Sequence, residues 1–307
     1  MDVLIGRGWM MLKATVNSNS ETITLLGVTI QPRSLDAMNL LVEEGISGDH
    51  KWIISNHNLH SLYLYHRHAR LRAFYSLAHW THIDGMPLIA LGRLYGHRLR
   101  REQRVTFVDL VYPLMALAAR RAWKVFYVGS SQITLERAVY LLRLQHPSLQ
   151  LEVRDGYFDE RLGSQDTEEL VQRINAYEPD LLIVGMGMPR QEFWTYDNFS
   201  RLKARVILPS AGAAFDYVAG EVPTPPRWSR RLGLEWAFWF AHAPIRLMDR
   251  YVFEPLFVLM LDCSRSRDRD ILRARIKPEG RFENGEAQQA IVETGRENSS
   301  AFLDGRP

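Results

Sequence analysis

The sequence predicts an α/β fold: a Rossmann-like, mostly parallel sheet with helices on both faces. Two observations support this prediction. Apolar runs of strand length alternate along the chain with stretches of helical periodicity, and such alternation indicates βαβ units. Several of the expected strands also run into short turns of glycine and polar residues. A sheet of this kind places its ligand crevice at the carboxyl ends of the strands.

The expected strands are short and lie between polar or turn-forming residues. Residues 1–20 show no clear pattern and are expected to be flexible, and the chain enters the domain with a strand over Thr22–Ile30. Continuous apolar runs then mark strands that helices cover on both faces. These strands are Lys51–Ser55, Trp80–Ile83, Lys124–Val128, Leu149–Val153, Asp180–Val184 and Arg205–Leu208.

The expected helices fill the intervals between the strands. Each has apolar residues that recur at helical spacing. The helices are Leu35–Glu44, Leu59–Ala78, Phe107–Trp123, Ile133–Gln145, Thr167–Tyr177 and Gln191–Leu202. Together the strands and helices form an α/β domain over residues 21–220.

Composition is that of a globular protein. The chain has 307 residues, 46% of them hydrophobic and 24% charged, which excludes wholesale disorder and fibrous folds. Its single cysteine, Cys263, cannot form an intrachain disulfide. Thirty-eight basic and 35 acidic residues give a net charge of +3. That charge is too small to attract the whole molecule to nucleic acid, so no nucleic-acid partner is expected.

The composition changes after Gly220. Residues 221–261 begin with a proline-rich connection, and 224–251 hold five arginines, two acidic residues and six aromatic residues. We expect a basic, aromatic, helical appendage there. Residues 262–307 are polar and rich in arginine, aspartate, glutamate and glycine. They cannot bury enough apolar surface to offset the entropy of ordering, so a disordered tail is expected.

Membrane crossing and export are not predicted. Residues 1–12 lack the order of charged end, apolar stretch and cleavage site that defines a signal peptide, so we expect the chain to stay in the cytoplasm. The most apolar windows are Leu232–Ala243 and Tyr251–Leu261. Both are shorter than the about 20 residues of a spanning helix. Association with a membrane surface is left open.

Three expected strands end in turns of small or polar residues: Gly129–Ser131, Gly185–Pro189 and Ser210–Gly212. Glycine lets the backbone approach a ligand closely, and the unpaired N–H groups that open the next helix favour an anion such as a diphosphate. A tight βα turn needs such residues whatever it binds, so one turn decides little. Three turns at one sheet edge favour a nucleotide.

A nicotinamide or flavin cofactor fits these turns poorly. Gly185 and Gly187 occupy the first two positions of a dinucleotide fingerprint, but Arg190 stands at the third, and no acidic residue follows near Arg205–Leu208. A metal centre is not expected either. The eight histidines clustered in the first third of the chain match no zinc spacing, and no cysteine joins them. No cofactor is expected, and these histidines are assigned to the surface or to packing.

Asp84 is the carboxylate most suited to chemistry. It follows the apolar run Trp80–Ile83 directly and precedes Gly85, so it should project at the rim of the crevice. A carboxylate in that position can act as a general base toward a substrate hydroxyl. It can equally cap a helix that begins near Met86. Position alone leaves both interpretations open.

Six blocks of residues then carry a resemblance. The chain resembles the WecG/TagA/CpsF family of glycosyltransferases, also called glycosyltransferase family 26, over about residues 23–256. Because the blocks keep the family's order, the match is specific. The blocks are Ser55–Asn58, Thr81–Gly85, Arg104–Thr106 with Asp109, Gly185–Glu192, Gly212–Asp216, and Leu232–Trp236 with Pro244, Arg246, Arg250 and Tyr251.

The resemblance implies an inverting, metal-independent glycosyltransferase. Such an enzyme moves a hexose, glucose or N-acetylmannosamine, from a UDP-sugar donor to the 4-hydroxyl of a polyprenyl-diphosphate-linked sugar acceptor. It also implies that Asp84 is the base. Asn56 and Asn58 then orient sugar hydroxyls, their alternative being turn formation. Gln191 faces the donor or its diphosphate, its alternative being a helix cap, and Arg104 belongs with the substrate-binding residues.

For the appendage, the resemblance implies docking on the inner face of the cytoplasmic membrane and closure over the active site. Arg246 and Arg250 match arginines that neutralise the departing diphosphate, a role suited to the guanidinium group. Arginine combined with tryptophan and phenylalanine is typical of interfacial helices. The alternative is that the aromatic residues pack a helical cap and the arginines are solvated.

Several departures from the family pattern leave the donor open. Ile83 replaces the usual alanine and Phe107 the usual glycine, while Trp239 and Asp249 stand where basic residues are common. The blocks around Asn56 and Asp84 are closer to the exopolysaccharide branch, of the xanthan type. A non-catalytic, membrane-associated nucleotide-sugar-binding component of a polysaccharide assembly complex is the main alternative, ahead of an oxidoreductase. A homo-oligomer is left open.

Overall fold

The structure is a computed structural model, and it describes residues 22–209, 214–222, 254–258, 260 and 261. Its centre is a six-stranded sheet in which every strand pair is parallel. The strand order is β4-β3-β8-β7-β5-β6. The strands are β3 (Trp52–His57), β4 (Trp80–Ile83), β5 (Lys124–Gly129), β6 (Gln150–Arg154), β7 (Leu181–Gly185) and β8 (Val206–Leu208). The predicted parallel sheet is confirmed.

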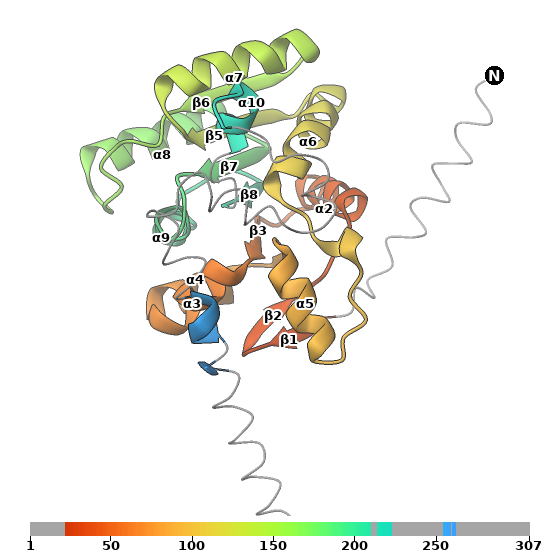
Figure 1. Ribbon diagram of the computed structural model, residues 1–307. Coiled ribbons are helices and arrows are strands. Elements are labelled where there is room, and N and C mark those ends of the chain that lie inside the picture. The colour runs from red at the N-terminus through yellow and green to blue at the C-terminus, as the bar shows by residue number, and fades with distance from the viewer. Residues whose placement is uncertain (1–21, 210–213, 223–253, 259, 262–307) are drawn as a thin grey trace, which may run out of the picture. The chain divides into compact units, whose positions relative to one another are not determined.

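Helices cover both faces of this sheet, as predicted (Figure 1). One face carries α2 (Leu35–Ser47), α6 (Phe107–Arg121), α7 (Gln132–Gln145) and α10 (Ala214–Ala219). The other carries α3 (Leu59–Arg67), α4 (Ala69–Leu77), α8 (Gln165–Tyr177) and α9 (Arg190–Asn198). Side chains of a strand alternate between the two cores, so Val125 and Tyr127 of β5 face the first layer while Phe126 and Val128 face the second.

The prediction of one strand over Thr22–Ile30 is wrong, because the chain forms two short strands there. The structure has a hairpin there, in which β1 (Ile23–Leu25) pairs antiparallel with β2 (Val28–Ile30). Leu26 and Gly27 both have positive φ, 48° and 85°, which is the signature of a two-residue type I′ turn. Leucine is uncommon at such a position, so the residue types did not reveal the turn.

The helix expected over Leu59–Ala78 is two helices. His68 adopts an extended conformation, with φ −119° and ψ 113°, and separates α3 from α4. Two further elements were absent from the expected helices: α5 (Met86–Leu94), which has a proline in its first turn, and the short 3-10 helix η1 (Arg101–Gln103). Both lie between β4 and α6.

Residues 254–258 are helical and pack against α3. The ring of Phe257 lies edge-on to Tyr63, with centroids 5.1 Å apart, and Glu254 Oε1 lies 2.5 Å from His60 Nδ1. The remaining parts of the expected appendage at 223–253, the tail at 262–307 and the N-terminus at 1–20 lie outside the described residues. Those three assignments stay predictions.

Candidate functional site

The candidate site lies at the carboxyl edge of the parallel sheet. His57 at the end of β3 pairs with Ile83 at the end of β4, and Gly129 of β5 pairs with Gly185 of β7. The residues that follow these four therefore emerge side by side at one edge. Asp84, Asn58 and two of the predicted glycine-rich turns are among them.

Asp84 is held by two amide side chains from β3 and the residue after it. Asn56 Nδ2 donates to Asp84 Oδ2 at 2.9 Å, and Asn58 Nδ2 donates to the same oxygen at 3.4 Å. The Asp84 backbone N–H donates to His57 O at 2.8 Å, which continues the parallel ladder past the strand end. The carboxylate is partly exposed. The sequence blocks at 55–58 and 81–85 therefore form one cluster.

The helix after Asp84 begins without a side-chain cap. Its N-cap residue is Gly85, whose φ is 121°, and Pro87 lies in its first turn. The alternative interpretation placed Asp84 in that capping position. The Asp84 carboxylate instead accepts hydrogen bonds from Asn56 of β3 and from Asn58 just after it, and it lies at the rim of the sheet.

Asn58 caps a helix and also contacts Asp84. Its Oδ1 accepts from the Ser61 N–H at 2.9 Å, and Ser61 Oγ accepts from the Asn58 N–H at 2.9 Å, which makes a capping box at the start of α3. Its Nδ2 meanwhile points at Asp84. Asn56 is 2% exposed, and its Oδ1 has no hydrogen-bond partner among the residues described.

Arg104 reaches the same edge from the segment before α6. It forms a parallel β-bridge with Ile83, and the Val105 N–H donates to Ile83 O at 2.9 Å. Its Nη2 lies 3.2 Å from Asp109 Oδ2, which also accepts from Thr106 Oγ1 at 2.7 Å. The backbone of Arg104 is thus one residue from Asp84 across the bridge, and its substrate-binding role stays a prediction.

Gln191 is buried and has protein partners for both atoms of its side-chain amide. Its side chain is 1% exposed, and its Oε1 accepts from the Gly187 N–H at 3.1 Å. Its Nε2 donates to Pro209 O at 3.0 Å and to Glu192 Oε1 at 2.7 Å. The amide therefore ties the loop after β7 to the end of β8, which matches the helix-start interpretation better than contact with a donor.

The predicted glycine-rich turns after β5 and β7 are neighbours. A Cβ on Gly129 would lie 2.4 Å from Gly185 O, so only glycine permits this approach. Ser130 Oγ donates to Asp216 Oδ2 at 3.0 Å, which brings α10 to the same place. The third turn, Ser210–Gly212, lies outside the described residues, as do Arg246 and Arg250.

The clustered histidines include two that are buried in the fold. Burial lowers the pKa of His57 to about 3 and that of His82 to about 4, so both are neutral at pH 7. His57 stacks on Tyr75, with ring centroids 4.0 Å apart. Across the described ranges, no three metal-ligating side chains come together. The packing role expected for these two histidines is confirmed.

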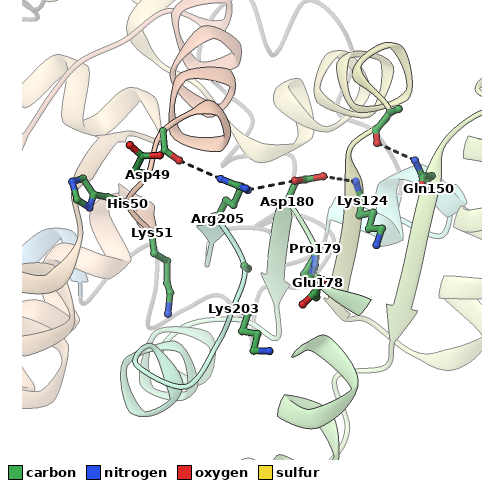
Figure 2. A pocket seen from close by; sticks show the side chains of 13 residues that line it. Asp49, His50, Lys51, Lys124, Gln150, Glu178, Pro179, Asp180, Lys203 and Arg205 are labelled. Carbon is green, nitrogen blue, oxygen red and sulfur yellow. Dashed lines mark hydrogen bonds and ion pairs between the residues drawn. The ribbon is translucent and has the colours of Figure 1, made fainter. Parts of the chain in front are cut away.

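An open pocket of about 600 Å³ lies at the opposite edge of the sheet, where β3, β5, β7 and β8 begin (Figure 2). Three of its charged groups have protein partners: Lys51 Nζ donates to Phe199 O at 2.6 Å, and Arg205 Nε lies 3.8 Å from Asp180 Oδ1. None of the predicted site residues within the described ranges lines it. The carboxyl edge is therefore the candidate site.

Among the helices that the structure describes, none combines the length and the apolar character needed to cross a bilayer.

Comparison with known proteins agrees with the sequence blocks. Relatives from Staphylococcus aureus strains NCTC 8325 and MRSA252 are named N-acetylglucosaminyldiphosphoundecaprenol N-acetyl-beta-D-mannosaminyltransferase. Each is 28% identical over 144 residues, which is 46% of this chain and 54% of the relative. The chain thus matches about half the length of these curated relatives. The model of the family described as Glycosyl transferase WecG/TagA/CpsF matches residues 23–270, and the chain belongs to this family.

Proposed function

We propose that the protein is an inverting glycosyltransferase. It transfers a hexose, glucose or N-acetylmannosamine, from a UDP-sugar to the 4-hydroxyl of a polyprenyl-diphosphate-linked sugar in the assembly of a surface or exopolysaccharide. The observation that carries the proposal is the Asp84 carboxylate at the carboxyl edge of the sheet, oriented by Asn56 and Asn58. Family membership and the names of the relatives support the reaction class.

In this reaction Asp84 acts as the general base. The acceptor hydroxyl gives its proton to the carboxylate while its oxygen attacks the anomeric carbon of the donor sugar. The bond from that carbon to the UDP oxygen breaks in the same displacement, and the configuration inverts. The two amide hydrogen bonds on Oδ2 set the orientation of the carboxylate, which is the positioning that a single-displacement transfer requires.

The departing diphosphate needs positive charge and N–H donors. The loops after β5 and β7 offer backbone N–H groups at the same edge as Asp84. Arg104 is bridged to the strand end that carries Asp84. We assign Arg246 and Arg250 to the same task when the appendage closes over the site, since arginine binds phosphate oxygens in a bidentate manner.

The acceptor places the enzyme at the inner face of the cytoplasmic membrane. A polyprenyl diphosphate is anchored in the bilayer, so its sugar is presented at the membrane surface. The arginines and aromatic residues at 224–251 are the composition of an interfacial segment. The protein then acts as a peripheral enzyme, and its partners are the UDP-sugar, the lipid-linked acceptor and the membrane surface.

The experiment that tests the function is a transfer assay with Asp84→Asn. Purified protein is given a panel of UDP-sugars and a short-chain diphosphate-linked acceptor, with and without chelator. We expect Asp84→Asn to lower the transfer rate by at least about a thousandfold, within the range of losses that follow removal of a catalytic group, while UDP binding by calorimetry is retained.

The matched control is Asp180→Asn at the opposite edge of the sheet, whose Oδ2 accepts the Lys124 N–H. An asparagine can keep that hydrogen bond, so the transfer rate should stay near that of the wild type. Wild-type turnover by Asp84→Asn would refute the proposed mechanism. Intact polysaccharide output with Asp84→Asn in cells would favour the non-catalytic alternative.

A further inference from the structure

A buried polar cluster lies behind the candidate site, between the end of β3 and helices α4 and α9. Its members are Ser55 on β3, Tyr75 on α4 and Glu192 on α9, and none of them was assigned a role from the sequence. Ser55 Oγ, Glu192 Oε2 and Thr195 Oγ1 are buried without a hydrogen-bond partner among the described residues. Such a concentration of unsatisfied atoms is unusual in a folded core and calls for an explanation.

Glu192 is the unusual member. Its side chain is 0% exposed, and Oε1 accepts from Gln191 Nε2 at 2.7 Å. Within the described part of the chain it forms no ion pair. A buried carboxylate with no counter-charge is costly, so a group in this position retains its proton. Burial accordingly raises the pKa of Glu192 to about 8.

Tyr75 lies near Glu192, close enough for the two groups to interact electrostatically, and it also contacts the strand end. Its hydroxyl donates to Asn56 O at 2.9 Å, and its ring stacks on His57. Burial raises the pKa of Tyr75, and the nearby Glu192 carboxyl raises it further. Tyr75 therefore remains a hydrogen-bond donor at all working pH values, and its single proton is directed to the backbone of Asn56.

The buried cluster contacts the candidate site in two places. Through Tyr75 it holds the backbone of Asn56, whose side chain donates to Asp84. Through Gln191 it holds the loop at Gly187 and the end of β8. The other ionisable groups around the cluster are Asp84 after β4, His57 from β3, His82 from β4 and His66 from α3. His57 is neutral, so it supplies no counter-charge to Glu192.

We propose that Glu192 is held as a neutral carboxylic acid and that Glu192 and Tyr75 are positioning residues for Asp84, so that ionisation of Glu192 sets the upper pH limit of transfer. An ionised carboxylate is a stronger acceptor than a backbone carbonyl. If Glu192 ionised, its carboxylate would accept the hydrogen bond from the Tyr75 hydroxyl, and Asn56 O would lose that bond. The end of β3, which carries the Asn56 amide that donates to Asp84, would then be less constrained. The kinetic part of this inference rests on the proposed transferase function.

The first test measures protonation without any assay of activity. Wild type and Glu192→Gln are unfolded with urea at a series of pH values. Because the unfolded chain releases the Glu192 proton near pH 4.5 while the folded chain keeps it until about pH 8, the stability of the wild type falls with rising pH relative to Glu192→Gln. We expect the ratio of their unfolding equilibrium constants to change about tenfold per pH unit between pH 5 and pH 7.5.

The control is Glu169→Gln, the same substitution at an exposed glutamate that accepts from Gln165 Nε2 at 2.7 Å. Its stability relative to the wild type should show no such slope, because its carboxylate is in contact with water in the folded chain and burial does not disfavour its charge. A flat ratio for Glu192→Gln would overturn the inference, whatever the activity of the protein.

The second test is the pH profile of kcat. We expect wild-type transfer to fall about fivefold between pH 8 and pH 9, as one proton is lost near pH 8. Glu192→Gln should keep its rate over that range. Tyr75→Phe, which removes the hydrogen bond to Asn56 O, should lower kcat about three- to tenfold with little change in the donor KM. The kcat of this variant should also lose the decline above pH 8, because ionised Glu192 then has no Tyr75 hydroxyl to attract.

The outcomes of the two tests separate the two proposals. A sloping stability ratio with no transfer of any sugar would refute the proposed function and leave the neutral Glu192 established. Active enzyme whose Glu192→Gln variant keeps the wild-type decline above pH 8 would refute the positioning role. A lower kcat for Tyr75→Phe with an unchanged decline above pH 8 would also refute it, because that result indicates packing alone.

Discussion

The hydrogen bond from the Asn56 amide to the Asp84 carboxylate should be sensitive to a charge added at position 56. Its Nδ2 lies 2.9 Å from Asp84 Oδ2, so Asn56→Asp would place two carboxyl groups within hydrogen-bond distance. Two such groups share one proton, and the pKa of the pair for loss of that proton rises. We expect the pH below which the transfer rate declines to move upward by about one unit or more, measured as a pH profile of kcat/KM.

Asn56→Ala is the control for that prediction. It removes the donor without adding a charge, so it should lower the rate while leaving the low-pH decline within about half a unit of the wild type. A profile for Asn56→Asp that matches the profile of Asn56→Ala would show that Asp84 is not the group whose ionisation limits transfer.

At single positions, the sequence predicts features that depend on neighbouring residues in the chain and misses features that depend on packing between distant segments. Asp84 could be predicted because a carboxylate directly after an apolar run must emerge at a strand end. Glu192 could not, because it reads as an ordinary residue in the first turn of a helix. Its burial arises from the packing of α9 against α4, and the spacing of apolar residues in the sequence does not predict that contact.

At the scale of elements, the close approach of two strand ends is what joins the loops of the site. A Cβ on Gly129 would lie 2.4 Å from Gly185 O, and its φ is 155°. Gly129→Ala must push the ends of β5 and β7 apart. We expect it to lower the free energy of unfolding by about 1–3 kcal/mol in urea denaturation, and to weaken UDP binding in calorimetry.

Gly163→Ala is the matched control, since Gly163 also has positive φ, 81°, but has no atom near its would-be Cβ. Its cost should be limited to backbone strain, about 1 kcal/mol, with UDP binding unchanged. Equal losses of stability and of UDP binding in both variants would show that the contact between the strand ends does not shape the site.

The two chain breaks that sequence analysis missed, at Leu26–Gly27 and at His68, share a physical cause. The strands of the parallel sheet were predicted because their apolar runs report burial on both faces. The turn at Leu26 and Gly27 and the break at His68 depend on single backbone conformations. Apolar spacing continues through both positions, so the pattern predicts one strand and one helix. The chain forms two strands and two helices instead.

For the molecule as a whole, the doubly wound sheet explains why the site residues come from such distant parts of the chain. Parallel strands direct every carboxyl end to one edge, so Asn56, Asp84, Arg104 and Gly187 all lie at or beside that edge, although more than a hundred positions separate the first from the last. The amino ends of the same strands lie at the opposite edge, where Asp180 accepts from the Lys124 N–H and pairs with Arg205. The proposed chemistry at one edge and these structural contacts at the other follow from a single topology.

The proposed association with a membrane is tested at the scale of the whole molecule, because the net charge of +3 is too small to hold the protein on a bilayer. In this proposal the attraction comes from local arginines, each worth about 1 kcal/mol near an anionic surface. Arg246→Glu combined with Arg250→Glu should therefore reduce binding to vesicles containing anionic lipid by at least about tenfold, in co-sedimentation at low salt. Wild-type binding itself should weaken as salt is added.

The control is Arg98→Glu combined with Arg137→Glu, two exposed arginines of the α/β domain. This variant has the same change in net charge, so it separates a local basic surface from the charge of the whole molecule. It should retain most of its vesicle binding and its transfer to a lipid-linked acceptor. If both double variants lost binding equally, the arginines at 246 and 250 would have no special place at the membrane. The enzyme would then have to reach its acceptor through another surface.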